Sequence, residues 1–145
     1  MKNKYDVLKL DHQLCFPLYA VSKEIVRHYT PYLSALDITY TQYITLMVLW
    51  EEEQVSVKEL GKRLFLDSGT LTPLLKTLEK KGLVTRNRSK EDERILMVSI
   101  TEQGLQLREK ALDVPAKVGG CIHLEPEEAM QLYTIVHKMM KQMEP

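Results

Sequence analysis

The sequence predicts a mainly α-helical fold with one small β-hairpin, and three observations support this fold class. Apolar residues recur at spacings of three and four along most of the 145 residues, as they do on amphipathic helices. Two stretches, residues 83–88 and 95–100, instead alternate as strands do and enclose a polar turn. Between residues 56 and 94 the order is helix, tight turn, helix and hairpin, with basic side chains spread along it. That order is typical of a winged helix-turn-helix.

The first helix is expected over about residues 8–29. Pro17 cannot lie deep in a straight helix, so the helix either begins near Leu14 or is kinked at the proline. If it begins near Leu14, the Cys15 sulfur lies at a helix N-terminus, which favours negative charge there. The apolar stripe that predicts this helix comprises Leu14, Leu18, Val21, Ile25 and Tyr29.

Capping boxes predict the starts of the next two helices. Residues 56–59 (SVKE) open a helix with Leu60 and Leu64 on its apolar face. Residues 39–42 (TYTQ) open an earlier helix that should be largely buried, with apolar members Tyr43, Leu46, Met47, Leu49 and Trp50.

The following helix is the candidate for reading DNA. Asp67 or Ser68 is its predicted N-cap, and leucines at positions 71, 74, 75 and 78 should face the core. Pro73 fits a helix that begins near Thr70 and should bend one that begins at Asp67. A small, hydroxyl-rich face suits a major groove, although a solvated face is the simpler interpretation. That face comprises Ser68, Gly69, Thr70, Thr72, Pro73 and Lys76.

The hairpin is the candidate wing. Gly82 should end the preceding helix, and residues 89–93 form a polar tip. Asp92 is placed to hold Arg94 outward, toward a narrow minor groove, although an ordinary surface salt bridge is the alternative. The candidate DNA contacts of the wing are Arg86, Arg88, Lys90, Asp92 and Arg94.

Two helices are expected after the hairpin. Thr101 should cap a helix that ends by Pro115 or at the glycine pair 119–120, and Pro126 should begin the last helix. The last helix presents a broad apolar surface, which requires a partner. That surface comprises Ala129, Met130, Leu132, Tyr133, Val136, Met139, Met140 and Met143.

Composition and charge indicate a single domain over residues 1–145. The net charge is zero, but residues 55–100 hold ten basic and six acidic side chains, a surplus of four. No apolar run approaches the roughly 20 residues of a membrane span, and no signal peptide is recognisable. We therefore expect a cytoplasmic protein without membrane contact. Histidine and cysteine spacings match no metal site, and we expect no metal and no other cofactor.

Residues 82–94 (GLVTRNRSKEDER), with a glycine after the reading helix and an Asp-Glu-Arg wing, resemble the MarR family of dimeric bacterial repressors. Residues 14–16 (LCF), the downstream tyrosines and residues 66–73 (LDSGTLTP) resemble its OhrR branch, which senses organic hydroperoxides. The likeness covers essentially the whole chain. It implies a homodimer formed by about residues 6–30 and 101–143, whose lobes, about residues 55–100, bind a palindromic operator in double-stranded DNA.

The resemblance also implies that an organic hydroperoxide oxidises Cys15, with support from the phenols of Tyr19, Tyr29 and Tyr40. The oxidised repressor then releases its operator, which derepresses peroxide-resistance genes. Without the resemblance, a lone helical cysteine is more often an inert apolar residue. Either a low-molecular-weight thiol traps the oxidised Cys15 or Cys121 resolves it, and a spare thiol at Cys121 is almost as good an interpretation.

Two other hypotheses remain. One is a repressor of the same fold that a small aromatic ligand releases without thiol oxidation. The other is a thiol peroxidase, which is the weakest because nothing beyond Cys15 forms a catalytic constellation. We therefore expect a regulator and not an enzyme.

Overall fold

The computed structural model describes residues 3–144, and it confirms the mainly helical fold with a winged helix-turn-helix. Two short 3₁₀ turns, Lys4–Leu8 and Leu10–His12, precede the first α-helix. In chain order the elements are then α1 (Cys15–Ser34), α2 (Tyr40–Glu52), β1 (Gln54–Ser56), α3 (Val57–Leu64), α4 (Ser68–Lys80), β2 (Val84–Arg88), β3 (Leu96–Ile100), α5 (Glu102–Ala111), α6 (Val114–Gly119) and α7 (Pro126–Gln142).

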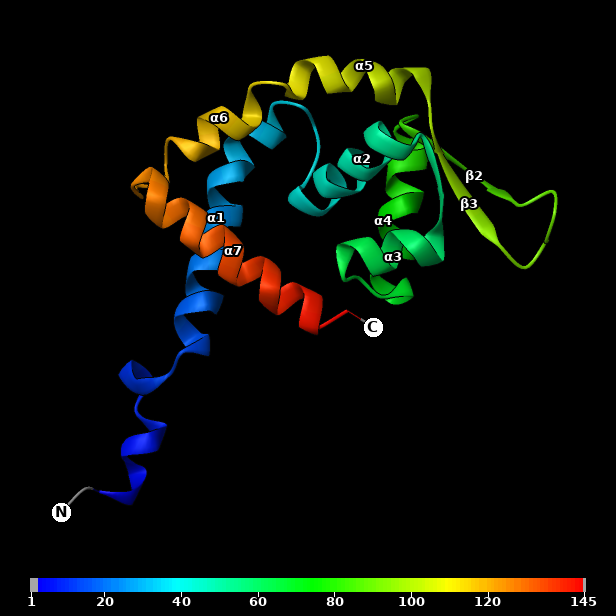
Figure 1. Cartoon of the computed structure of the whole chain (residues 1–145). Helices are drawn as coiled ribbons and strands as arrows, with labels where there is room; N and C mark the ends of the chain where they lie inside the picture. Colours follow the sequence, from blue (N-terminus) through cyan, green and yellow to red (C-terminus); the bar gives the residue numbers. More distant parts are fainter. Residues whose placement is uncertain (1–2, 145) are drawn as a thin grey trace.

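The helices α2, α3 and α4 pack with the sheet into a lobe from which the β2–β3 hairpin projects (Figure 1). Helix α5 leads from the hairpin back to α6, which packs against α1. The core of the lobe is built from leucines of α2, α3 and α4 and valines of the strands. Helix α7, by contrast, has no buried residue. Among residues 3–144, no helix is both long enough and apolar enough to cross a membrane.

The first α-helix begins at Cys15, so the expected start near residue 8 is wrong and the alternative start near Leu14 is confirmed. Pro17 is consequently the third residue of the helix, where a missing amide hydrogen has no helical partner to lose. Local hydrogen bonds stabilise the 3₁₀ turns before it, because the side-chain amide of Gln13 donates to the carbonyls of Val7 and Lys9. Helix α1 also runs further than predicted, past Pro31 to Ser34.

The reading helix α4 is capped by Asp67, whose Oδ1 accepts a hydrogen bond from the Thr70 amide at 2.8 Å. Its four leucines are buried, as predicted. The helix begins at Ser68, however, so Pro73 lies inside it and not in its first turn. The Pro73 nitrogen therefore cannot donate to the preceding turn, while its carbonyl accepts from the Thr77 hydroxyl at 3.0 Å.

Gly82 ends α4 as predicted, in the left-handed conformation with φ +78°. The Gly82 amide donates to the Glu79 carbonyl and the Leu83 amide to the Leu78 carbonyl, at 2.9 and 3.0 Å. This pair of bonds is a Schellman motif, which satisfies the last carbonyls of the helix. It also sets the direction in which the chain enters β2.

The sheet has three strands in the order β1-β3-β2, one more than the hairpin predicted from the sequence. Both pairings are antiparallel, and Val55 of β1 lies opposite the buried Val98 of β3. Ser56 ends β1 and also caps α3, where its hydroxyl accepts from the Glu59 amide at 3.1 Å. Only the serine half of the expected capping box forms. A three-residue strand is too short for its alternation to be recognised in a sequence.

The remaining helices confirm some predictions and correct others. The capping box of α2 forms in full, but Met47 is 44% exposed and not buried as expected. The helix capped by Thr101, α5, ends at Ala111, which confirms the alternative that it ends by Pro115. A further helix that the sequence did not predict, α6, then starts with Pro115 in its second position. Helix α7 begins at Pro126 as predicted.

Candidate DNA interface and redox site

The exposed face of α4 carries all six residues predicted to meet a major groove. Ser68, Gly69, Thr70, Thr72, Pro73 and Lys76 are exposed, and the buried leucines occupy the opposite face. Hydrogen bonds from the Thr70 amide, and then from its hydroxyl, hold the pKa of the Asp67 carboxyl below its usual value. Asp67 therefore keeps its charge and its capping bond at neutral pH. The first turn of α4 is thereby ordered before any DNA binds.

The tip of the wing presents an oriented arginine. The Arg94 guanidinium donates through Nε and Nη2 to the two carboxylate oxygens of Asp92, each at 3.0 Å, and its amide donates to Oδ1 at 3.0 Å. These bonds lower the pKa of Asp92 and raise that of Arg94, so both stay charged. The Arg94 side chain is nevertheless 90% exposed. A fixed but exposed guanidinium is the geometry that a minor groove accepts.

The other basic residues of the wing fall into two groups. Arg88 and Lys90 are exposed and belong, like Arg94, to the hairpin. Arg86 is only 20% exposed, since its guanidinium and its amide donate to the Glu79 carboxylate at 3.1 and 3.0 Å. Its Nε is buried and has no partner in the described part of the chain. Arg86 therefore ties β2 to α4 and does not lie with the exposed basic side chains.

Cys15 is the first residue of α1 and is exposed. Tyr19 lies one helical turn further on and is also exposed, with the Lys23 ammonium 5.4 Å from the centre of its ring. The Cys15 thiol is therefore accessible to a reagent in solution.

The other predicted tyrosines form a cluster at the far end of α1. The rings of Tyr29 and Tyr40 lie 4.9 Å apart, and Tyr43 lies 5.7 Å from Tyr29. Burial raises the pKa of all three phenols, and their mutual proximity raises those of Tyr40 and Tyr43 further. They are therefore neutral hydroxyl donors at physiological pH. Tyr43 was expected only as an apolar residue of its helix, although its position three residues after Tyr40 places the two on one helix face.

Within one protomer the cysteine does not meet this cluster. Cys15 and Tyr29 are fourteen residues apart on the same helix, which corresponds to about 21 Å at 1.5 Å per residue. Tyr19 is the only predicted supporting phenol near Cys15 within the residues that the structure describes.

Cys121 lies at the end of α6 and is half-buried. Its thiol contacts the Lys117 carbonyl at 3.8 Å, and the Lys117 ammonium lies 5.7 Å from the centre of the Tyr32 ring. Tyr32 is seventeen residues along α1 from Cys15, or about 25 Å. Cys15 therefore lies at one end of α1 and Cys121 beside the other, whereas a disulfide requires Cα atoms within about 7 Å. No cluster of metal-ligating side chains occurs in residues 3–144.

A family profile described as transcriptional regulator SarA/Rot matches residues 27–111, which is more than half of the chain. The chain belongs to this family. It is a winged-helix transcriptional regulator of the MarR type, so the predicted fold and the predicted family are confirmed. Its relatives are regulators of transcription and not enzymes.

One relative is the organic hydroperoxide resistance transcriptional regulator of Bacillus subtilis, which is 48% identical over 97% of this chain and 96% of the relative. AbfR of Staphylococcus epidermidis has been solved in several forms. The reduced form bound to DNA is 34% identical, covers 97% of both chains and has a TM-score of 0.76. The disulfide form is 35% identical, covers 94% of this chain and 96% of that one, and has a TM-score of 0.64. This MarR-type chain thus shares the shape of a regulator that binds DNA.

Proposed function

We propose that this regulator is a repressor that binds its operator in the reduced state and releases it when an organic hydroperoxide oxidises Cys15. The observation that carries the proposal is an exposed cysteine at the start of α1 in a chain 48% identical, over nearly its full length, to an organic hydroperoxide resistance regulator. Release of the operator would derepress genes that protect the cell from peroxides.

The proposed binding of DNA rests on the exposed face of α4 and on Arg94. The face is small and rich in hydroxyls, so the helix can approach base edges and phosphates closely in a major groove. Arg94, with Arg88 and Lys90 near it, supplies positive charge at the tip of the hairpin for the flanking minor groove. Arg86 acts indirectly in this arrangement, because it fixes β2 against α4.

In the proposed dimer, about residues 6–30 and 101–143 form the contact between the subunits. The lobe of about residues 55–100 is left free to bind DNA. Large apolar side chains are exposed along α1 and α7, among them Leu14, Phe16, Met130, Tyr133 and Ile135. Exposed apolar surface of this extent marks an interface between proteins. A two-fold dimer would present two copies of α4 to a palindromic operator.

The sensing chemistry starts with the Cys15 thiolate. It attacks one peroxide oxygen, the O–O bond breaks, the sulfur becomes a sulfenic acid, and the alkoxide takes a proton and leaves as the alcohol. Tyr19 of the same helix can donate to the leaving oxygen. Because Tyr29 and Tyr40 lie about 21 Å away within one protomer, they can support Cys15 only across the dimer.

The comparison with AbfR supports a change of shape on formation of a disulfide. Its reduced, DNA-bound form and its disulfide form are equally similar to this chain in sequence, but the first superposes better, at TM-scores of 0.76 and 0.64. The conformation of this chain accordingly resembles the DNA-bound forms, reduced and overoxidised alike at a TM-score of 0.76, more than the disulfide form. Oxidation would then move the lobes away from their operator half-sites.

The test is a DNA mobility shift with a duplex that the reduced wild-type protein selects from a random-sequence library. Cumene hydroperoxide should release the wild-type protein, and dithiothreitol should restore binding. The Cys15→Ser variant should bind the same duplex but stay bound after peroxide, because a serine hydroxyl is too weak a nucleophile at neutral pH. Equal release of the variant and the wild type would rule out Cys15 as the sensor. Peroxide consumption far beyond one equivalent per thiol would instead indicate an enzyme.

A further inference from the structure

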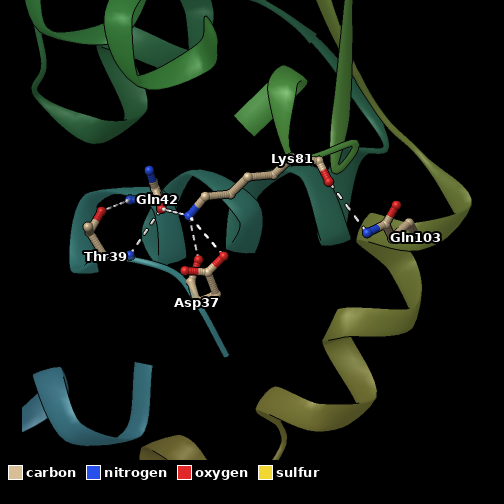
Figure 2. Close-up of polar contacts among 5 residues, drawn as sticks. All are labelled: Asp37, Thr39, Gln42, Lys81 and Gln103. Atoms are coloured by element: carbon tan, nitrogen blue, oxygen red, sulfur yellow. Dashed lines mark hydrogen bonds and ion pairs between the residues drawn. The ribbon is translucent and has the colours of Figure 1, made fainter. Parts of the chain in front are cut away.

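Lys81, the C-cap residue that follows α4, reaches across to the corner between α1 and α2. Its ammonium donates to the main-chain oxygen of Asp37 and to Oε1 of Gln42, the latter at 3.4 Å, and lies 3.8 Å from the Asp37 carboxylate (Figure 2). The Lys81 side chain is only 28% exposed. The Asp37 carboxylate is 93% exposed and contributes little, so the two neutral oxygens hold the ammonium.

Gln42 connects this contact to the first turn of α2. Gln42 is buried, and its Oε1 also accepts from the Thr39 amide at 3.1 Å, which is one half of the capping box of α2. Figure 2 shows Lys81 and Thr39 converging on this one side-chain oxygen. The end of the DNA-reading helix and the start of α2 therefore share an acceptor, and neither can shift without disturbing the other.

The same corner carries the tyrosine cluster. Tyr40 is the first residue of α2, two positions before Gln42, and its ring packs on Tyr29 of α1. The corner itself turns at Asp37, a non-glycine residue in the left-handed conformation with φ +57°. If the cluster moves, Gln42 moves with it, because the two lie within one helical turn. Lys81 is then displaced as well, because its ammonium donates to Gln42.

Polar bonds at this junction add to apolar packing, because Ile38 of the corner belongs to the same core as Leu78 of α4. A pocket of about 250 Å³ opens beside the Lys81 side chain, between the corner and α5. On the α5 side the main-chain oxygen of Lys81 accepts from Nε2 of Gln103 at 3.4 Å. Because the space next to the lysine is not filled by side chains, its ammonium is the polar link between the corner and the end of α4 on this side.

We propose that Lys81 is a positioning residue that couples the tyrosine cluster to the DNA-reading helix. It holds α4 in the DNA-binding orientation while the α1–α2 corner is in its reduced position, and it carries movement of that corner to α4 when Cys15 is oxidised. The inference rests on the proposed function, in which Tyr29 and Tyr40 of the cluster support Cys15 across the dimer.

The test compares Lys81→Met with Lys80→Met, a matched control one residue earlier that removes the same charge from the exposed end of α4. Affinity for the selected duplex is measured before and after cumene hydroperoxide, with the oxidation of Cys15 followed by mass spectrometry. In Lys81→Met, Cys15 should be oxidised at the wild-type rate. The ratio of the affinity before peroxide to the affinity after it should, however, be about tenfold smaller than in the wild type. Lys80→Met and Lys81→Arg should keep that ratio within about twofold.

The outcomes separate this inference from the proposed function. A wild-type ratio in Lys81→Met, even with weaker binding in both states, would show that the lysine is only structural and would overturn the coupling while the sensor stands. A wild-type protein that peroxide does not release would overturn both. If Lys81→Met fails to fold, Lys81→Gln, whose shorter amide does not reach the Asp37 carbonyl, is judged by the same ratio.

Discussion

At the scale of single residues, charge-assisted hydrogen bonds decide which side chains are available to DNA. Arg94 and Arg86 are both paired with a carboxylate, but the Asp92 pair leaves Arg94 exposed whereas the Glu79 pair draws Arg86 into the lobe. The pKa of Asp92 is lowered by its bonds to Arg94, so the stabilisation from this pair is present above the unfolded pKa of about 4 and is lost only as the pH falls through the still lower folded pKa. The wing arginine therefore stays ordered throughout the range from about pH 5 to pH 8.

We predict that Asp92→Asn weakens binding to the selected duplex by roughly two- to tenfold, because Arg94 must then be ordered during binding. Glu93→Gln is the matched control, since it removes the same charge from the neighbouring exposed residue without touching Arg94. It should bind equally well or slightly better, because one repulsion of phosphate is gone. Fluorescence anisotropy at fixed salt measures both, and equal affinities of the two variants would contradict the orienting role of Asp92.

At the scale of elements, the ends of α4 determine how it is held. Asp67 orders its first turn, and Gly82 closes it in a conformation that residues with a Cβ rarely adopt. A Cβ on Gly82 would also lie 2.9 Å from Oε1 of Gln103, the side chain that contacts Lys81. We predict that Gly82→Ala lowers the free energy of unfolding by about 1–2 kcal/mol, measured by urea denaturation.

The control for this substitution is Gly119→Ala in α6, where a Cβ meets nothing within 4 Å and the backbone is helical. Alanine should be neutral or stabilising there, by up to about 1 kcal/mol. A destabilisation by Gly82→Ala no larger than that by Gly119→Ala would show that the Schellman motif does not limit the stability of the lobe.

At the scale of the whole molecule, a single protomer is incomplete. Cys15 begins α1 and lies about 21 Å along it from Tyr29 of the cluster, whereas the Cys121 thiol contacts Lys117, whose ammonium lies over Tyr32 near the other end of α1. The unburied apolar residues of α7 likewise require a second surface. Any direct resolution of Cys15 by Cys121 must therefore join two subunits, with the Cys121 thiol displacing water from the Cys15 sulfenic acid.

We predict that stoichiometric cumene hydroperoxide produces a covalent dimer on non-reducing electrophoresis. The dimer should vanish in Cys121→Ser and in Cys15→Ser, since each removes one sulfur of the bridge. A monomeric wild-type band, with a mass increase that matches an added small thiol, would assign the resolving role to a low-molecular-weight thiol instead.

The sequence by itself determined the reading lobe. Hydrophobic period, the N-cap at Asp67, the glycine at 82 and the Asp-Arg pair of the wing are local signals, and each predicted the feature that the structure shows. The exposed residues of α4 could also be predicted from the sequence, because burial of the leucine stripe determines which side chains face outward. The cysteine and two of the cluster tyrosines were found through family resemblance and not through local physics.

Tertiary structure alone decided the features that depend on distant partners. Strand β1 forms because β3 offers it a ladder, and Arg86 is withdrawn because Glu79 lies beside it. Met47 stays exposed because no residue of the described range 3–144 covers it. The start of α1 was left open by the sequence between two alternatives, and the Lys81 contact joins residues about forty positions apart. Such contacts have no periodicity to reveal them, since they arise from where the fold brings two segments together and not from the pattern of either one.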